Sequence, residues 1–333
     1  MSNLLEELLS QKEVVVADGA MGTNLFELGL ANGAAGELWC VDYPDRVRSV
    51  HQGFVEAGAD IILTNSFSAN RYRFKLHRIE DRVREINTAA ARVAREIADA
   101  AGRPVVVAGS MGPTGDILEP LGERTAQEAE DAFAEQAQAL KEGGVDVAWI
   151  ETMFAHDELA AAVKAAQRVG LPYVATMTFD TGGRTMMGVK PHDAIELTKD
   201  FTSRPVAFGA NCGVGPAQLL DSVVGLGKGA SNGTVVVAKS NCGIPQIGEG
   251  GKIEYSGTPQ IMADYACLAR DAGARIIGGC CGTTPAHLKV MVEALKTRPK
   301  ESPPSYEVIE RLLGPIKITV DIKPAVAVQA SPS

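Results

Sequence analysis

Residues 276–284 read Ile-Ile-Gly-Gly-Cys-Cys-Gly-Thr-Thr, an apolar run that stops at two glycines, two adjacent thiols and a turn. A helical pattern begins directly afterwards, near Pro285. A short apolar strand joined through a few polar residues to a helix is the repeating unit of α/β proteins. The stretch therefore indicates alternating strands and helices, with reactive side chains in the turn between them.

The same alternation extends through most of the chain. The predicted strands cover residues 14–17, 60–64, 105–109, 146–150, 173–178, 206–210, 234–238 and 275–278. Helical patterns follow them over residues 45–57, 79–101, 126–142, 157–168, 193–201, 217–224, 259–272 and 285–295. Glycines at 58, 143–144 and 273 indicate helix C-caps. Eight strands alternating with eight helices predict a single (β/α)8 barrel of the TIM type.

An open, doubly wound sheet also alternates strands with helices. Such sheets usually carry a glycine-rich phosphate fingerprint at the first turn, and Gly19-Ala-Met-Gly does not supply it. We therefore expect the barrel to occupy residues 1–298. Residues 299–333 are rich in proline and serine and predict a C-terminal extension that lies over the surface or a neighbouring subunit, with its last residues mobile. A homo-oligomer is expected.

The composition narrows the possible classes of function. The chain has 333 residues, 45% of them hydrophobic, and a net charge of −9, which argues against nucleic-acid or anionic membrane partners. No apolar run reaches the length of a membrane span, and the first residues lack a secretory pattern, so a cytoplasmic protein is expected. In a reducing compartment, six cysteines favour metal binding or catalysis over disulfides.

Polar residues beside glycines follow nearly every predicted strand. Because all βα loops of a barrel lie at one end, these groups should converge on one pocket. The stretches are Asp18-Gly-Ala-Met-Gly, Thr64-Asn-Ser-Phe, Ser110-Met-Gly-Pro-Thr-Gly-Asp, Glu151-Thr-Met, Thr178-Phe-Asp, Asn211-Cys-Gly, Ser240-Asn-Cys-Gly and Cys280-Cys-Gly-Thr.

Three of the thiols could hold one soft metal ion. Cys280 and Cys281 are adjacent, and a third thiol would come from Cys212 or Cys242, which the spacing cannot separate because both follow Asn and precede Gly. Three protein ligands leave a tetrahedral zinc with an open position, as in catalytic sites, and a sulfur-rich site favours a sulfur substrate. The alternative is that the thiols only pack as small apolar groups, which we expect for Cys40 and Cys267.

Two carboxylates are candidates for binding a cation such as a substrate ammonium. Asp18 and Glu151 follow predicted strands without an obvious Lys or Arg beside them, although Asp18 could instead serve a turn or cap. Backbone amides of residues 19–22 and 110–112 could bind an anion such as a carboxylate. Ammonium, carboxylate and thiol sites together describe an amino acid that carries a thiol.

These residues resemble the zinc-dependent homocysteine S-methyltransferase family. The resemblance rests on Asp18-Gly-Ala-Met-Gly-Thr, Thr64-Asn-Ser-Phe, Gly109-Ser-Met-Gly-Pro-Thr-Gly, Glu151-Thr-Met, Gly209-Ala-Asn-Cys and Gly278-Gly-Cys-Cys-Gly-Thr-Thr-Pro-Ala-His, and runs from about residue 10 to 295. It implies a (β/α)8 barrel in which zinc is bound by Cys212, Cys280 and Cys281, with homocysteine as the fourth ligand. Cys242 is then outside the ligand set.

The resemblance also implies roles in substrate binding. Asp18 and Glu151 would lie near the homocysteine ammonium, and the backbone of Gly19, Ala20 and Met21 near its carboxylate. Asn65, Ser110 and Asn211 are expected to line the same pocket.

The methyl donor is expected to be small, because 333 residues cannot hold the further modules of a full methionine synthase. Residues 37–45 and 65–73 look like the bacterial betaine–homocysteine branch, which implies glycine betaine as donor. S-methylmethionine or another sulfonium donor, or a corrinoid or folate partner protein, remain alternatives. Because aromatic faces bind onium groups, we expect Trp39, Phe67 and Tyr72 at the donor site, although Trp39 could instead anchor its loop.

Overall fold

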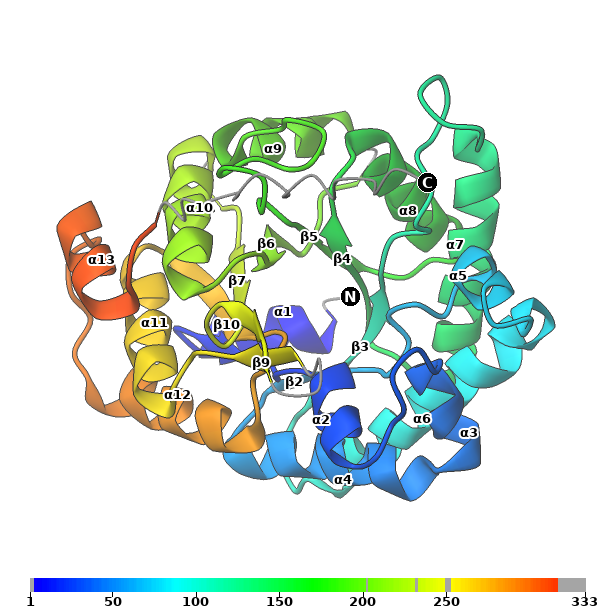
Figure 1. Cartoon of the computed structure of the whole chain (residues 1–333), viewed down its shortest axis with the longest axis horizontal. Helices are drawn as coiled ribbons and strands as arrows, with labels where there is room; N and C mark the ends of the chain where they lie inside the picture. The colour runs from blue at the N-terminus through cyan, green and yellow to red at the C-terminus, as the bar shows by residue number, and fades with distance from the viewer. Residues whose placement is uncertain (1–2, 202, 231–232, 249–252, 317–333) are drawn as a thin grey trace, which may run out of the picture.

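The barrel is closed by pairing between its first two strands. The structure, a computed structural model, describes residues 3–201, 203–230, 233–248 and 253–316. Its main sheet has eight strands in the order β1-β10-β7-β6-β5-β4-β3-β2, and a parallel bridge between Ala17 and Ile61 joins the two ends of that order. Helices surround this sheet (Figure 1). The predicted (β/α)8 barrel is confirmed.

All eight predicted strands are present. They are β1 (Val15–Val16), β2 (Ile61–Leu63), β3 (Val106–Met111), β4 (Val147–Met153), β5 (Tyr173–Met177), β6 (Ala207–Cys212), β7 (Val236–Ser240) and β10 (Ala274–Gly279). Four of them, β3, β4, β6 and β7, continue two or three residues beyond the predicted ends. The hydrophobic pattern stops at the first polar side chains, whereas the backbone ladder continues through them. Several site residues therefore lie on rigid strands and not in loops.

The eight predicted helices form the outer layer. They are α4 (Pro44–Ala57), α6 (Val83–Ala100), α7 (Ala126–Gly143), α8 (His156–Arg168), α9 (Pro191–Leu197), α10 (Pro216–Gly229), α11 (Pro259–Asp271) and α12 (Pro285–Thr297). At all three predicted helix ends a glycine has a left-handed backbone, with φ of 106° at Gly58, 101° at Gly144 and 101° at Gly273. Only glycine adopts such angles without strain, so these positions end each helix and start the turn to the next strand.

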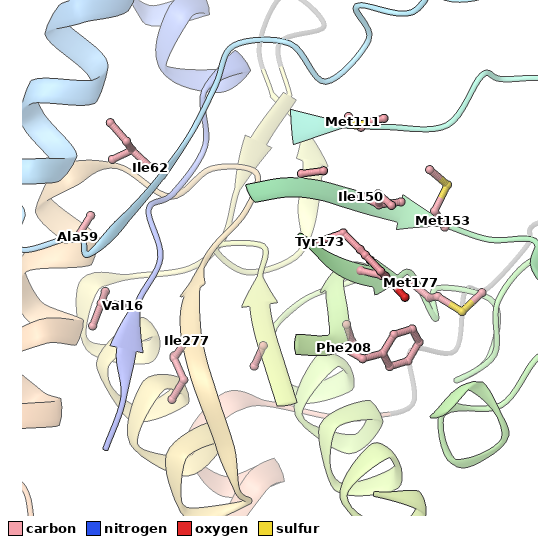
Figure 2. Close-up of a cluster of buried hydrophobic side chains, with 14 of the residues drawn as sticks. Val16, Ala59, Ile62, Met111, Ile150, Met153, Tyr173, Met177, Phe208 and Ile277 are labelled. Atoms are coloured by element: carbon pink, nitrogen blue, oxygen red, sulfur yellow. The ribbon is translucent and has the colours of Figure 1, made fainter. Parts of the chain in front are cut away.

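Strand side chains alternate between two buried clusters. Residues such as Val15, Ile61 and Trp149 fill the barrel interior, together with leucines of α1 (Leu4–Gln11), which packs against them. Their neighbours along the strands, including Val16 and Phe208, face the helices instead (Figure 2). The barrel is therefore a packed core, and ligands must bind at its rim.

Several elements were not predicted. Short helices α2 (Gly22–Glu27), α3 (Trp39–Asp42) and α5 (Arg71–Lys75) lie in the loops after β1 and β2, and a hairpin of β8 (Pro245–Ile247) and β9 (Ile253–Tyr255) follows β7. Within the C-terminal extension, α13 (Tyr306–Leu313) packs on α10 and α11. The last residues, which we expected to be mobile, lie outside the described residues. In the described part of the chain, no helix combines the length and apolarity needed to cross a membrane.

The close approach of β6 and β7 should make Gly209 indispensable. A Cβ atom at Gly209 would lie 2.0 Å from the backbone oxygen of Val237. We expect Gly209→Ala to lower the free energy of unfolding by about 3 kcal/mol or more, because two backbones must separate. Denaturant unfolding followed by circular dichroism measures this. Gly22→Ala is the matched control, since a Cβ there meets nothing within 4 Å; equal stability of the two variants would contradict the prediction.

Candidate metal centre and substrate site

Three thiols converge at the carboxyl end of the barrel. The Sγ atoms of Cys212, Cys280 and Cys281 all lie within 4.8 Å of one another. Cys212 ends β6, whereas Cys280 and Cys281 follow β10, and β7 lies between these two strands. Tetrahedral zinc with Zn–S bonds of about 2.3 Å places sulfurs about 3.8 Å apart. The cluster therefore fits such an ion with small adjustments of the side chains, and it leaves one coordination position open.

The other three cysteines lie outside this cluster. Cys242, which the spacing could not exclude, is buried next to it, and its N–H donates to the Cys281 carbonyl at 2.8 Å. Cys40 is buried in the main core, with its thiol 3.5 Å from the Asn65 carbonyl. Cys267 is buried beside Ala263 and Ala294. The packing roles that we expected for Cys40 and Cys267 agree with these positions.

Asn211 joins the thiol cluster to the end of β4. Its amide donates to Thr152 Oγ1 at 2.7 Å and its oxygen accepts from the Thr152 N–H at 2.8 Å. Both Thr152 and Cys212 have left-handed backbones, with φ of 62° and 61°. This conformation is unfavourable for a residue with a side chain, above all a β-branched one, and it persists only where neighbours enforce it. The paired hydrogen bonds of Asn211 provide that restraint.

Asn241 was predicted at the rim only as part of Ser240-Asn-Cys-Gly, with no role of its own. It lies on the loop after β7, and its Oδ1 accepts from the Cys281 N–H at 3.1 Å. Its Nδ2 donates to the Gly213 carbonyl at 2.6 Å. Asn241 therefore connects the loop that carries Cys281 to the residue that follows Cys212. Its position between Ser240 and Cys242 in a polar strand end was the only available signal.

The three cluster thiols are partly buried. The contact with Cys280 lowers the pKa of the Cys212 thiol, but the contact with Cys281 and burial outweigh it and raise that pKa to about 12. Neutral thiols are therefore favoured in the absence of a cation, and a bound metal would be needed to hold them as thiolates.

The two buried carboxylates have different partners. Asp18 Oδ2 accepts from the Leu63 N–H at 2.7 Å, and Asp18 Oδ1 lies 2.7 Å from Lys239 Nζ. Glu151 Oε1 accepts from Ser110 Oγ at 2.5 Å. The expectation that neither carboxylate has a basic neighbour is therefore wrong for Asp18. Lys239 lies on β7, far away in sequence, and only the barrel register brings the two side chains together.

The predicted anion-binding amides are only partly available. The N–H of Ala20 donates to the Thr283 carbonyl, and those of Ser110 and Gly112 donate to Thr64 Oγ1 and the Phe67 carbonyl. Among the residues that the structure describes, no acceptor is found for the N–H groups of Gly19 and Met21. These two amides are the ones that a substrate carboxylate could use.

A cavity of about 410 Å³ opens at the same rim of the barrel as the thiol cluster. Thr152, which is hydrogen-bonded to Asn211, forms part of the cavity wall. The other lining residues come from the loops after β2, β3, β4 and β5: Phe67, Arg73, Pro113, Gly115, Phe154, Thr178, Asp180, Thr181 and Met186. Phe67 was expected at the donor site, whereas Phe154 and Arg73 were not singled out from the sequence.

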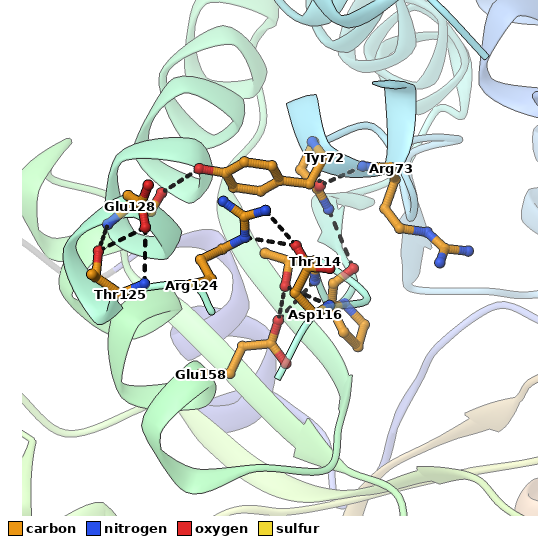
Figure 3. A network of polar contacts seen from close by, with 10 residues as sticks. Tyr72, Arg73, Thr114, Asp116, Arg124, Thr125, Glu128 and Glu158 are labelled. Carbon is orange, nitrogen blue, oxygen red and sulfur yellow. Dashed lines mark hydrogen bonds and ion pairs between the residues drawn. The ribbon is translucent and has the colours of Figure 1, made fainter. Parts of the chain in front are cut away.

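The other two predicted donor contacts do not line this cavity. Trp39 is 7% exposed, belongs to the main core and packs edge-on against Tyr43. The Tyr72 ring is covered by the Arg124 guanidinium, 3.3 Å from the ring centroid, and its hydroxyl donates to the Glu128 carbonyl (Figure 3). Their assignment to the donor site stays a prediction, and these contacts favour structural roles for both.

Asn65 and Glu158 fix the loops around the site. The Asn65 amide donates to the Gly36 carbonyl at 2.9 Å, which ties the loop after β1 to the end of β2. Glu158 Oε1 accepts from both the N–H and the hydroxyl of Thr114, and so holds the loop after β3 (Figure 3). Asn65 therefore has a structural partner in addition to its predicted role in substrate binding.

Comparison with known protein families identifies the chain. The family model for homocysteine S-methyltransferase matches residues 15–295. The chain belongs to the homocysteine S-methyltransferase family. The residues through which the sequence resembles this family are those that meet at the rim.

The curated relatives are considerably longer proteins. The chain is 34% identical over 321 residues to methionine synthase of Mycobacterium tuberculosis, which covers 91% of this chain but 26% of that protein. It is 32% identical over 307 residues to methionine synthase of Mycobacterium leprae. The chain thus spans about a quarter of the length of these relatives.

The solved structures support the fold. The oxidized form of the homocysteine methyltransferase MmuM from Escherichia coli has a TM-score of 0.75, with 24% identity, over 90% of this chain and 100% of that one. Its metallated form has a TM-score of 0.72. At this identity the likeness shows the shared barrel alone.

Loss of any cluster thiol should remove bound metal without unfolding the barrel. We expect Cys212→Ala or Cys280→Ala to lower the zinc content from one equivalent to near zero, because two thiols cannot complete the site. Metal analysis after dialysis, with circular dichroism to check folding, measures the effect. Cys242→Ala and Cys267→Ala are the matched controls and should keep their zinc. Loss of zinc in Cys242→Ala would show that the ligand set is wrong.

Proposed function

We propose that this chain transfers a methyl group from a small onium donor, glycine betaine in the first instance, to the sulfur of homocysteine, which gives methionine and dimethylglycine. One observation carries the proposal: three thiols, a buried carboxylate and a rim cavity meet at the same end of the barrel. The family makes homocysteine methylation the expected reaction class.

Zinc is the metal that fits the proposed ligands Cys212, Cys280 and Cys281. A zinc ion bound there would act as a Lewis acid that lowers the pKa of a substrate thiol and makes it a nucleophile at neutral pH. The protein's own contribution is orientation. Asn211 and Asn241 hold the residues around the cluster through the hydrogen bonds described above, so the three thiols would be held in place for a metal.

The amino-acid part of homocysteine has matching groups nearby. The Glu151 carboxylate is buried and is bonded to Ser110 and, at 3.5 Å, to Asn211, which leaves capacity for a substrate ammonium. The free N–H groups of Gly19 and Met21 suit the substrate carboxylate. Fixing both groups places the thiol against the methyl donor, and such orientation supplies much of the rate of a displacement reaction.

The rim cavity suits a small zwitterionic donor. Phe67 and Phe154 offer aromatic faces to an onium group, and Arg73 offers a guanidinium to a carboxylate. In the reaction, the homocysteine sulfur forms a bond to the methyl carbon while the nitrogen–methyl bond breaks. The bonding electron pair stays on nitrogen, so the cationic donor leaves as dimethylglycine. A sulfonium donor such as S-methylmethionine would react in the same way.

A second candidate function is favoured by the curated relatives. Both are methionine synthases about four times as long as the matched region. A barrel of this kind could present homocysteine to a methyl-corrinoid or methyl-folate partner. In the first function the isolated chain methylates homocysteine from a small donor, and in the second it does so only with a partner protein.

A donor panel tests the proposal. Zinc-loaded protein and homocysteine are mixed separately with betaine, choline, S-methylmethionine and a dimethylsulfonio acid, and methionine is quantified by mass spectrometry. We expect methionine and dimethylglycine in equal amounts with betaine, and little with choline, which lacks the carboxylate. Activity only with the sulfonium compounds would reassign the donor. Silence with all four, together with retained homocysteine binding, would favour the partner-dependent module.

Substitution of two aromatic residues should show which one contributes to donor binding and which one contributes to stability. Phe67→Ala is expected to lower kcat/KM for the donor about fivefold or more, with homocysteine affinity nearly unchanged, because a cation–π contact is worth about 1 kcal/mol at a partly exposed site. Trp39→Ala is the comparison variant. Its buried ring predicts a loss of about 3–5 kcal/mol in unfolding free energy. If Trp39→Ala instead lowers kcat/KM for the donor alone and leaves the stability normal, Trp39 belongs to the donor site.

A further inference from the structure

Lys239 is a buried cation for which the family-level description of the site has no role. It lies on β7, and its side chain is 2% exposed. Its ammonium lies 2.7 Å from Asp18 Oδ1 and 3.4 Å from the Asp18 carbonyl oxygen. It also lies 5.7 Å from the centre of the Trp149 ring, which fills the barrel beneath the rim. A lysine is rarely buried so completely unless it has a partner of opposite charge.

Both oxygens of Asp18 have close partners within the protein. Oδ1 faces Lys239, and Oδ2 accepts from the Leu63 N–H at 2.7 Å. Glu151 is bound less tightly, since the one partner found for its Oε2 among the described residues is the Asn211 amide at 3.5 Å. The charge of Lys239 acts on Glu151 as well, but the close ion pair is with Asp18. The two carboxylates thus differ in how closely their oxygens are bound within the protein. Oε2 of Glu151 is the oxygen that can best accept a strong new hydrogen bond from a ligand.

We propose that Lys239 is a positioning residue that assigns different roles to the two carboxylates: it retains Asp18 in an internal ion pair, so that Glu151 alone receives the ammonium of the substrate. This inference rests on homocysteine as the substrate. It departs from the expectation that both Asp18 and Glu151 contact that ammonium.

The charges of the site support this division. Asp18 and Glu151 together bring two negative charges, and Lys239 brings one positive charge. One further positive charge balances these three side chains, and balanced charges are tolerated best in a buried place. A substrate ammonium supplies that charge. A thiol acid without an amino group does not, so the lysine also makes the site selective for an amino thiol.

The decisive variant removes both members of the ion pair. In Asp18→Asn/Lys239→Met the shapes are similar and the Asn oxygen can still accept from Leu63, while Glu151 keeps its charge. Binding to zinc-loaded protein is measured by calorimetry with two probes, homocysteine and 4-mercaptobutanoate, which is homocysteine without its amino group. We expect the double variant to bind homocysteine within about threefold of the unmodified protein. Each single variant should bind it at least tenfold more weakly, because a buried charge is left unpaired.

The two probes distinguish an ammonium contact from general damage. If Asp18 contacts the ammonium directly, the double variant loses affinity for homocysteine but not for 4-mercaptobutanoate, and the proposal is overturned. Glu151→Gln provides a second test that leaves the ion pair intact. It should abolish the preference for homocysteine over 4-mercaptobutanoate, and a preference that survives would also overturn the proposal. If the unmodified protein binds neither thiol, the proposed function itself fails.

Discussion

Parallel pairing around a closed sheet is the constraint on which the site depends. Because every strand runs in the same direction, all eight carboxyl ends lie at one rim, and residues more than two hundred positions apart become neighbours. The bridge between Ala17 and Ile61 completes this ring and brings Asp18 beside the Leu63 N–H. An open sheet would leave the strand that carries Asp18 at an edge, distant from the β4 carboxylate Glu151. The site is therefore a consequence of closure.

Closure alone does not orient the reactive groups. Cys212 and Thr152 both adopt left-handed backbones at the ends of their strands. Asn211 satisfies the backbone N–H and the hydroxyl of Thr152 at the same time, and it precedes Cys212 directly. The cost of these conformations is offset by hydrogen bonds within a rigid sheet, and the result is a thiol whose direction does not depend on a flexible loop.

The strands and the thiol cluster could be predicted, and the reason is the same in both cases. Apolar runs buried on both faces are visible in the sequence, and the polar residues that end them mark the rim. Lys239 escaped notice because a single charged residue near the end of an apolar run is indistinguishable from one that turns into solvent. Trp39 was expected at the donor site because it is an aromatic residue near the presumed rim, and its loop has no periodicity that fixes the direction of its side chains. The position of Lys239 depends on a contact across the barrel and that of Trp39 on packing in the main core, and no local pattern encodes either.

Charge balance connects the inner part of the site to its chemistry. Three thiols, two carboxylates and one ammonium side chain are gathered at this rim, and a buried charge there must be compensated by a fixed partner or by a ligand. Lys239 compensates Asp18 within the protein, and a divalent cation bound by the thiols would compensate two of their three thiolate charges. On our proposal, Glu151 is the carboxylate left for the substrate ammonium. A site arranged in this way would discriminate by charge as well as by shape, because a thiol lacking an ammonium leaves Glu151 without a cation in contact with it. On our proposal, the selectivity for an amino thiol arises from the buried ion pair between Lys239 and Asp18.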